Sequence, residues 1–214
     1  MNLLSFLKKL FVIPVLINSD KPVAKEEAKT VKLNLVKPQA KMTTKTKYPE
    51  QVKLSPQTNG QYSQKIMPKA IVAHDTGGNY SGSIDWTSRI INPSTGKRLY
   101  ATYHCIIARD GRRTITNEDH NRAYHAGISS FKGKKSLNGW SIGFAFERDS
   151  NTEPLQKEAI ESAIEYLIPR MKRWGIGLDD VTDHRTIAPN RKVDLNPKEF
   201  AKFKKALEEA WNKD

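Results

Sequence analysis

Several features that would place a chain in a class at once are missing from this sequence. It has 214 residues and a single cysteine, Cys105, which excludes an internal disulfide framework. Its most apolar stretch, residues 10–17, is too short to cross a bilayer as a helix. No internal repeat is apparent. The length and composition of the chain fit one globular domain that carries a tail.

A small-x-small cleavage site is also missing after the apolar residues 1–19, where the sequence continues as Asn18-Ser19-Asp20. The length of the apolar stretch and the preceding Lys8-Lys9 are nevertheless typical of a secretory signal. We therefore expect residues 1–19 to direct export. An uncleaved anchor, an interfacial helix and an element packed on the domain are the alternatives.

Arginine is absent from residues 20–69, which carry eleven lysines against four acidic residues. This segment has no sustained hydrophobic period, so we predict a flexible, self-repelling linker with one short strand at residues 31–35. Its charge indicates an anionic partner, such as an envelope polymer or a membrane surface, unless it serves only solubility. Nucleic acid is not expected, because the segment lacks the interleaved aromatic residues that stack on bases.

From residue 70 to residue 214 the pattern predicts a mixed α/β domain, with a central sheet flanked by helices. Short apolar runs predict strands at residues 70–74, 100–108, 113–116 and 141–147 and a last one that begins at Val181. Helical spacing predicts helices at residues 155–174 and 197–211, and a short one around residues 86–91. Cys105 falls in a predicted strand, and its surroundings favour a buried residue over a nucleophile.

The segment from Asp183 to Asp194 combines an imidazole, an ammonium and a carboxylate in a turn-rich, Pro-interrupted stretch. A loop that folds back can bring His184 and Asp194 to one metal ion, with a third ligand from elsewhere in the chain. Lys192 would then place a positive charge near the same cavity. Taken alone, such a segment is more often a solvated surface loop than a metal site.

Five segments of this chain occur in the order found in a known family. They are Ile71-Val72-Ala73-His74, Tyr103-His104-Cys105-Ile106-Ile107-Ala108-Arg109-Asp110-Gly111, Arg122-Ala123-Tyr124-His125-Ala126-Gly127, Asn138-Gly139-Trp140-Ser141-Ile142-Gly143, and His184 through Asp194. The set resembles the zinc-dependent N-acetylmuramoyl-L-alanine amidases of phage endolysins, bacterial cell-wall amidases and peptidoglycan recognition proteins. The resemblance implies the fold of that family for residues 70–214.

The resemblance also implies a site. Its zinc ligands would be His74, His184 and Asp194, with a fourth position left open for water or the substrate carbonyl. Lys192 is similar to the family's cationic residue that stabilises the oxyanion formed on attack.

Tyr103 matches a position at which some members carry a tyrosine that assists the attacking water. Other members use a glutamate on the strand after Ser-Ile-Gly, where this chain has Ala145, so Tyr103 is the expected catalytic partner and Glu147 the reserve general base. His104 is expected to be a buried histidine that supports the ligands. His125 is expected either to line the substrate groove or to cap its loop.

These features predict a zinc-dependent peptidoglycan hydrolase that cleaves the amide between N-acetylmuramic acid and L-alanine. Its compact build favours a phage or prophage lysin over a bacterial autolysin. It would act on the cell wall, in the periplasm or outside the cell, after synthesis in the host cytoplasm, and as a monomer. The alternative is a recognition module that binds peptidoglycan without cutting it.

Overall fold

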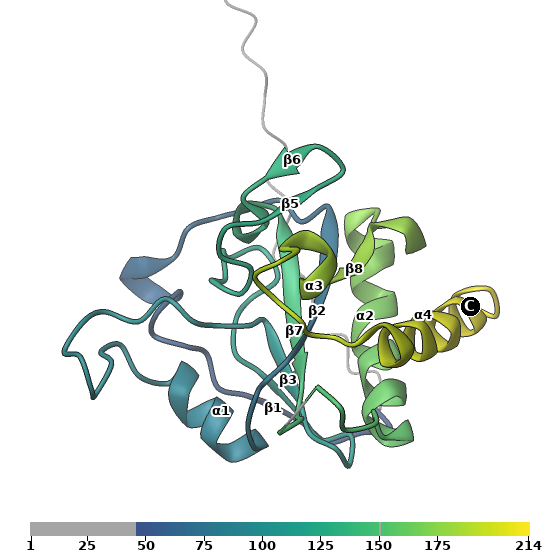
Figure 1. Cartoon of the computed structure of the whole chain (residues 1–214), viewed down its shortest axis with the longest axis horizontal. Helices are drawn as coiled ribbons and strands as arrows, with labels where there is room; N and C mark the ends of the chain where they lie inside the picture. Colours follow the sequence, from purple (N-terminus) through teal and green to yellow (C-terminus); the bar gives the residue numbers. More distant parts are fainter. Residues whose placement is uncertain (1–45, 150) are drawn as a thin grey trace, which may run out of the picture. The chain divides into compact units, whose positions relative to one another are not determined.

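The computed structural model describes residues 46–149 and 151–214, which belong to one compact unit of the chain (Figure 1). Its centre is a sheet with the strand order β1-β4-β3-β7-β2-β8. The strands are β1 (Glu50–Val52), β2 (Ala70–Asp75), β3 (Cys105–Ile107), β4 (Arg113–Ile115), β7 (Ser141–Phe146) and β8 (Val181–Asp183). Within the described residues, no helix is both long and apolar enough to cross a bilayer.

Four neighbouring strands of the sheet, β3, β7, β2 and β8, run parallel, so their carboxyl ends meet at one edge. In the centre, His74 of β2 lies opposite Ala145 of β7 in the register. A tight turn around Asp110-Gly111 joins β3 to β4, which is antiparallel to it, and β1 then pairs with β4 as the outermost strand. In open α/β sheets, ligands bind outside the carboxyl ends of parallel strands, so this edge is where a site is expected.

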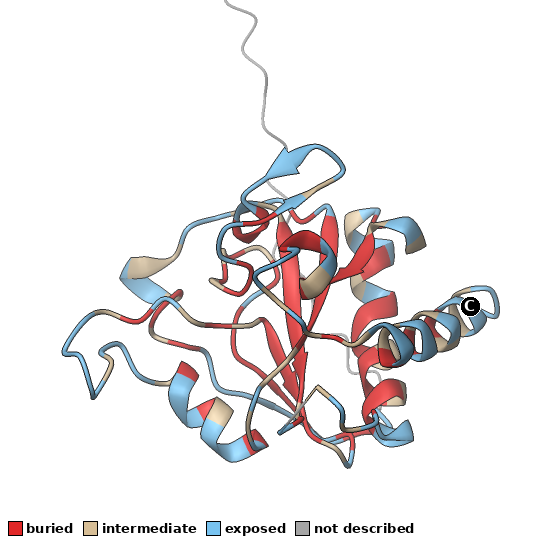
Figure 2. Ribbon diagram, in the orientation of Figure 1, coloured by how far each residue is buried: buried red, intermediate tan, exposed pale blue. Residues whose placement is uncertain are grey.

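Two long helices, α2 (Lys157–Trp174) and α4 (Pro197–Trp211), pack on one another beside the sheet and bury the main hydrophobic core (Figures 1 and 2). Helix α2 ends at Gly175, which adopts the left-handed conformation (φ 62°) that glycine accepts without strain. Helix α4 begins after Asn196, whose side chain accepts a hydrogen bond from the backbone N–H of Glu199. Both helices confirm the predictions made from the apolar periodicity of the sequence.

Successive side chains of β2 point to opposite faces of the sheet, and only one of these faces belongs to the main core. Ile71 and Ala73 belong to the main core, whereas Val72 and His74 point to the opposite face, because successive strand residues alternate. Shorter elements flank that opposite face: α1 (Tyr80–Thr87), the hairpin β5 (Ser130–Phe131) and β6 (Lys134–Lys135), and α3 (His184–Ile187). His74 is therefore delivered to the face that the long helices leave uncovered.

Several sequence predictions need correction. Residues 46–69 are part of the folded unit rather than linker, since β1 pairs with β4 and Tyr48 is buried. Tyr103 and His104 precede β3 instead of lying inside a strand, and His184 opens a short helix instead of a loop, with Asp183 accepting a hydrogen bond from the Thr186 N–H. The predictions for residues 1–19 and for the strand at 31–35 lie outside the described residues.

Candidate metal centre

A cavity of about 790 Å³ opens at the carboxyl ends of β2, β7 and β8. Residues from six separate segments line it, among them the loop after β2, helix α1, the turn after α3 and the segments around Tyr103 and His125. Its volume lies in the range of about 300–1,000 Å³ that is usual for small-molecule sites. His125, His184 and Asp194, which the sequence singled out, are among the residues that line it.

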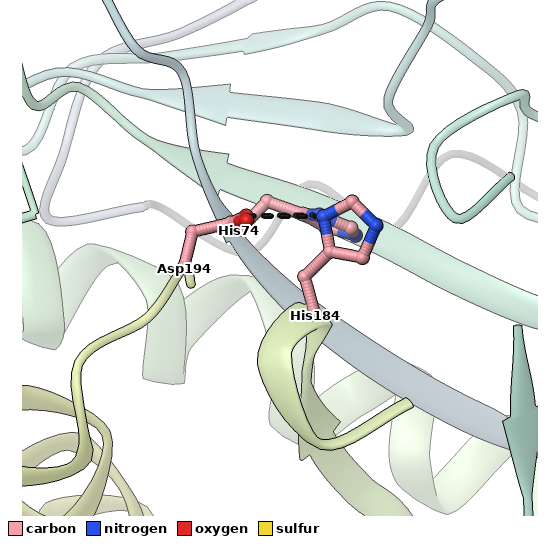
Figure 3. Close-up of side chains that lie close together, drawn as sticks. All are labelled: His74, His184 and Asp194. Atoms are coloured by element: carbon pink, nitrogen blue, oxygen red, sulfur yellow. Dashed lines mark hydrogen bonds and ion pairs between the residues drawn. The ribbon is translucent and has the colours of Figure 1, made fainter. Parts of the chain in front are cut away.

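The side chains of His74, His184 and Asp194 point toward one another (Figure 3). One ligand atom of each lies within 4.8 Å of the other two. Nδ1 of His184 is 3.1 Å and Nδ1 of His74 is 3.5 Å from Oδ2 of Asp194. The two imidazoles are almost fully buried and the carboxylate is 17% exposed, so the cluster faces the cavity from its wall.

These separations fit a zinc ion. Two tetrahedral ligands that each lie about 2.1 Å from zinc are about 3.4 Å apart, close to both nitrogen–oxygen distances in this cluster. Nδ1 of His74 is buried and makes no hydrogen bond among the described residues, a costly arrangement unless another group satisfies it. Two imidazoles and one carboxylate are also the donor set of several catalytic zinc sites.

The hydrogen bonds behind His74 fix which of its nitrogens is free. Ser141 Oγ donates to the carbonyl oxygen of Leu137 (2.7 Å), so it accepts from Nε2 of His125 (3.2 Å). Burial keeps both His125 and His74 neutral: the pKa of His125 is held well below its ordinary value, and that of His74 is lowered to about 4. Nδ1 of His125 therefore accepts from Nε2 of His74 (2.9 Å), which leaves the lone pair of His74 Nδ1 directed at the metal position.

Hydrogen bonds between the segments around His125 and Asn138 fix the positions of the imidazoles of His74 and His184. Oδ1 of Asn138 accepts the backbone N–H groups of His125 (3.0 Å) and Ala126 (2.7 Å). The carbonyl oxygen of Ala126 in turn lies 3.4 Å from Nε2 of His184, so Nδ1 of His184 is the nitrogen turned to the metal position. The structure thus explains why these two motifs carry a histidine and an asparagine. His125 also lines the cavity, and a contact between it and the substrate stays a prediction.

Gly143 is the residue that leaves room for the His125 ring. A Cβ atom at this position would lie 2.3 Å from Cγ of His125. We expect Gly143→Ala to displace the ring, break its hydrogen bond to His74 and lower the affinity for zinc about 10- to 100-fold, as loss of a ligand's hydrogen-bond partner does. Calorimetric titration of the metal-free protein with zinc measures this effect. Gly139→Ala is the matched control, since a Cβ atom there meets nothing within 4 Å; equal affinities of the two variants would contradict the role of His125.

Sequence reasoning missed a buried ion pair beside the cluster. Asp75, which directly follows His74, receives two hydrogen bonds from Nη1 of Arg148 (3.0 and 2.9 Å). Both side chains are nearly inaccessible to solvent, and they tie the loop after β2 to the loop after β7. Burial raises the pKa of Asp75 to about 6 in spite of Arg148. The position of Asp75 next to His74 could have indicated a role for it, but nothing in the sequence connects it to Arg148, 73 positions away.

Asp194 remains ionised in this setting. Burial works to raise its pKa, but the close approach of the His184 and His74 imidazoles outweighs that effect and holds the pKa far below its usual range. The carboxylate is therefore available as an anionic ligand at any physiological pH.

Lys192 and Tyr103 both line the same cavity. The backbone N–H of Lys192 donates to the carbonyl oxygen of Ala188, which closes the turn after α3. The ring centroid of Tyr103 lies 5.3 Å from that of His74, and burial, together with the charges of Asp194 and Asp75, raises the pKa of the phenol. Tyr103 thus keeps its proton and can act as a hydrogen-bond donor.

The placement of Glu147 differs from the prediction of a reserve general base. Its carboxylate accepts the backbone N–H groups of Tyr80 (2.9 Å) and Arg109 (3.0 Å) and pairs with the Arg109 side chain. It is not among the residues that line the cavity. The face alternation used in the prediction ignored the helix α1, whose first N–H group attracts this carboxylate. Ala145, by contrast, lies opposite His74 in the register of β2 and β7.

Buried neutral histidines should make the metal-free protein sensitive to acid. His104 accepts from the Gly143 N–H and donates to the Asn121 carbonyl, and burial lowers its pKa to about 4, as it does for His74. Between pH 6.5 and pH 4 such groups bind protons only in the unfolded chain, so stability falls as the pH falls, by up to about 1.4 kcal/mol per pH unit for each proton. The raised pKa of Asp75 opposes this with a single proton below about pH 6.

Urea unfolding of the metal-free protein at pH 7, 6 and 5 measures this dependence. We expect the free energy of unfolding to decrease over the series and His104→Asn to make the decrease shallower. A free energy that is unchanged between pH 7 and pH 5 would contradict the burial of neutral histidines.

Residues 63–197 match the family model described as N-acetylmuramoyl-L-alanine amidase. The chain belongs to this amidase family. The match covers more than half of the sequence and includes all three residues of the His-His-Asp cluster.

Individual family members are similar over parts of their length. A 1,6-anhydro-N-acetylmuramyl-L-alanine amidase, AmpD, from Haemophilus influenzae is 37% identical over 98 residues, which is 45% of this chain and 53% of that protein. The chain spans about half the length of the curated relatives it matches.

Solved structures of family members have the same architecture. PlyL superimposes with a TM-score of 0.57 at 14% identity, over 76% of this chain and 97% of PlyL. The amidase AmiD from E. coli, in complex with a muramoyl peptide, has a TM-score of 0.53 at 23% identity, over 68% of this chain and 60% of AmiD. At such identities the likeness establishes the fold, and it confirms the predicted α/β amidase architecture.

Proposed function

We propose that this protein is a zinc-dependent N-acetylmuramoyl-L-alanine amidase that hydrolyses the amide between the lactyl group of N-acetylmuramic acid and L-alanine in peptidoglycan. One observation carries the proposal: Nδ1 of His74, Nδ1 of His184 and Oδ2 of Asp194 converge at the wall of a large cavity, at distances that suit zinc. Relatives named as amidases of muramoyl–L-alanine bonds support the choice of substrate.

The chemistry divides between the metal and the protein. A zinc ion bound by His74, His184 and Asp194 would supply positive charge that activates water and polarises the amide carbonyl. Lys192 would neutralise the oxyanion that develops on that carbonyl, from its position on the cavity wall. Tyr103, held protonated by burial, would orient the attacking water by donating its hydroxyl proton in a hydrogen bond.

The rest of the cluster keeps this arrangement rigid. His125 and the Ala126 carbonyl fix the two imidazoles, and the buried pair of Asp75 with Arg148 anchors the loops on either side. Because several buried hydrogen bonds hold these side chains, their positions change little when a ligand binds.

A recognition module that binds peptidoglycan without cutting it is the alternative, and the complete ligand set with Lys192 disfavours it. Digestion of purified sacculi separates the two functions. We expect new L-alanine amino termini in the released peptides by mass spectrometry, and their loss when the protein is stripped of zinc. Binding to sacculi without new termini would refute the hydrolase and leave the recognition module.

We further propose that the protein acts at the cell wall, with the lysine-rich N-terminal segment attracted to anionic envelope polymers. A phage or prophage origin and a monomeric state stay predictions of the sequence. Relatives from bacteria and the structural neighbour LysCS, named as an endolysin, share the fold of this chain, so the fold does not separate the two origins.

A further inference from the structure

A second, smaller cavity of about 260 Å³ lies next to the cavity of the metal centre. Tyr100 and Tyr124 line both cavities, so the two lie side by side and share a wall. The remaining lining of the second cavity comes from residues 61–64 and Arg98, none of which lines the first. We refer to this second cavity as the tyrosine cleft. It is smaller than a usual complete ligand site, which suggests space for one further unit of a ligand already seated in the first cavity.

Aromatic rings dominate the tyrosine cleft. The Arg98 guanidinium stacks 3.5 Å from the ring centroid of Tyr62 and 5.3 Å from that of Tyr100. The Tyr100 ring stands edge-to-face to that of Tyr124, 4.9 Å away, and is 56% exposed. An exposed large ring that is held by its neighbours is a ready-made surface for stacking.

The walls of the cleft are fixed before any ligand binds. Gln57 is fully buried; its backbone carbonyl accepts from Arg98 (3.2 Å) and its side chain accepts from the Ala101 N–H (2.9 Å). On the other wall, the backbone and side-chain oxygens of Gln64 both accept from Arg122 (2.7 and 3.1 Å). A preformed surface of this kind binds with a small entropic cost.

We propose that the tyrosine cleft binds an N-acetylated sugar that adjoins the muramoyl residue, so that the substrate is a glycan strand rather than a single muramoyl peptide. Aromatic rings stack on the C–H faces of pyranoses, and the amides of Gln61 and Gln64 match the hydroxyl and acetamido groups of such sugars. The guanidinium of Arg98 lies against the Tyr62 ring and donates to the Gln57 carbonyl, so the cleft presents aromatic faces and amides rather than an unpaired charge.

The kinetic part of this inference rests on the proposed amidase function. We would compare a muramoyl tripeptide with substrates that carry the same peptide on two and four sugars. Wild-type kcat/KM should be about tenfold higher on the longer glycans, the gain expected from one well-placed contact of about 1.4 kcal/mol. Tyr62→Ala should reduce this advantage to about twofold or less and leave the single-sugar substrate unaffected, because Tyr62 does not line the main cavity.

Two controls keep the result interpretable. Gln61→Ala, at an exposed position that lines only the cleft, should give a smaller loss in the same direction and guards against misfolding of the Tyr62 variant. Trp211→Ala removes an aromatic side chain at the end of α4 and should change nothing in the glycan series. An advantage that follows peptide length and disappears in Tyr62→Ala would assign the cleft to the peptide stem and overturn the proposal.

Binding without catalysis provides an independent readout. Calorimetric titration of the full-length, metal-free protein with a tetramer of N-acetylglucosamine should show binding that Tyr62→Ala weakens about tenfold. If the oligosaccharide binds but no substrate is cleaved, the amidase function fails while the cleft stands. If it does not bind and glycan length gives no kinetic advantage, the cleft proposal is wrong.

Discussion

Replacing Asp194 with alanine should abolish both zinc binding and hydrolysis of peptidoglycan. Its Oδ2 atom is the only carboxylate oxygen in the described His-His-Asp cluster and lies 3.1 and 3.5 Å from the two imidazole nitrogens. Without it, two neutral imidazoles remain, one short of the three protein ligands of a catalytic zinc. We expect zinc content below detection after dialysis and a rate of muropeptide release at the background level.

Asp179→Ala is a matched control, because Asp179 is an exposed aspartate in the turn before β8. It should retain zinc and activity. Circular dichroism should show both variants folded, since Asp194 contributes no side chain to the hydrophobic core. Full activity of Asp194→Ala in a preparation free of metal would refute the metal centre.

Replacing Lys192 with alanine should separate the metal from the chemistry. The Lys192 ammonium makes no hydrogen bond or ion pair with another described residue, so its removal should leave the fold intact. Lys192 lines the cavity, as Asp194 does. Loss of one group that stabilises an oxyanion typically costs a factor of about 100 to 1,000 in kcat. We expect that loss in Lys192→Ala, with zinc stoichiometry unchanged and KM altered much less than kcat.

Lys198→Ala, which removes an exposed lysine near the start of α4, controls for the change in net charge. The two variants should bind zinc equally in a calorimetric titration. A kcat for Lys192→Ala that equals the wild-type value would make Lys192 a bystander and would shift the search for the oxyanion partner to Tyr103.

The sequence predicted the His-His-Asp cluster because the family's motifs carry it residue by residue. His74, His184 and Asp194 come from separate segments, and the structure brings their ligand atoms within 4.8 Å of one another. The supporting contacts could not be predicted in the same way. His125 to His74, Ala126 to His184 and Arg148 to Asp75 each join residues more than 50 positions apart, through tertiary packing that local patterns do not encode.

The fold likewise has elements that nearby residues determine and elements that depend on partners far along the chain. Helices α2 and α4 follow directly from their apolar periodicity and their end signals, Gly175 and Asn196. Residues 46–69 were misjudged because their polar, lysine-rich composition resembles a spacer. Their order depends on partners far along the chain: β1 on β4, and Gln57 on Arg98 and Ala101.

The outermost strand has a practical consequence for anyone who shortens this protein. The family match starts at residue 63, yet β1 (Glu50–Val52) pairs with β4, and Lys53 and Ser55 continue that ladder. A version trimmed to the match would lay bare the backbone donors and acceptors of β4, and open strand edges of this kind recruit other chains. Such a version should precipitate or self-associate even with its catalytic residues intact, so a useful truncation must begin ahead of Tyr48.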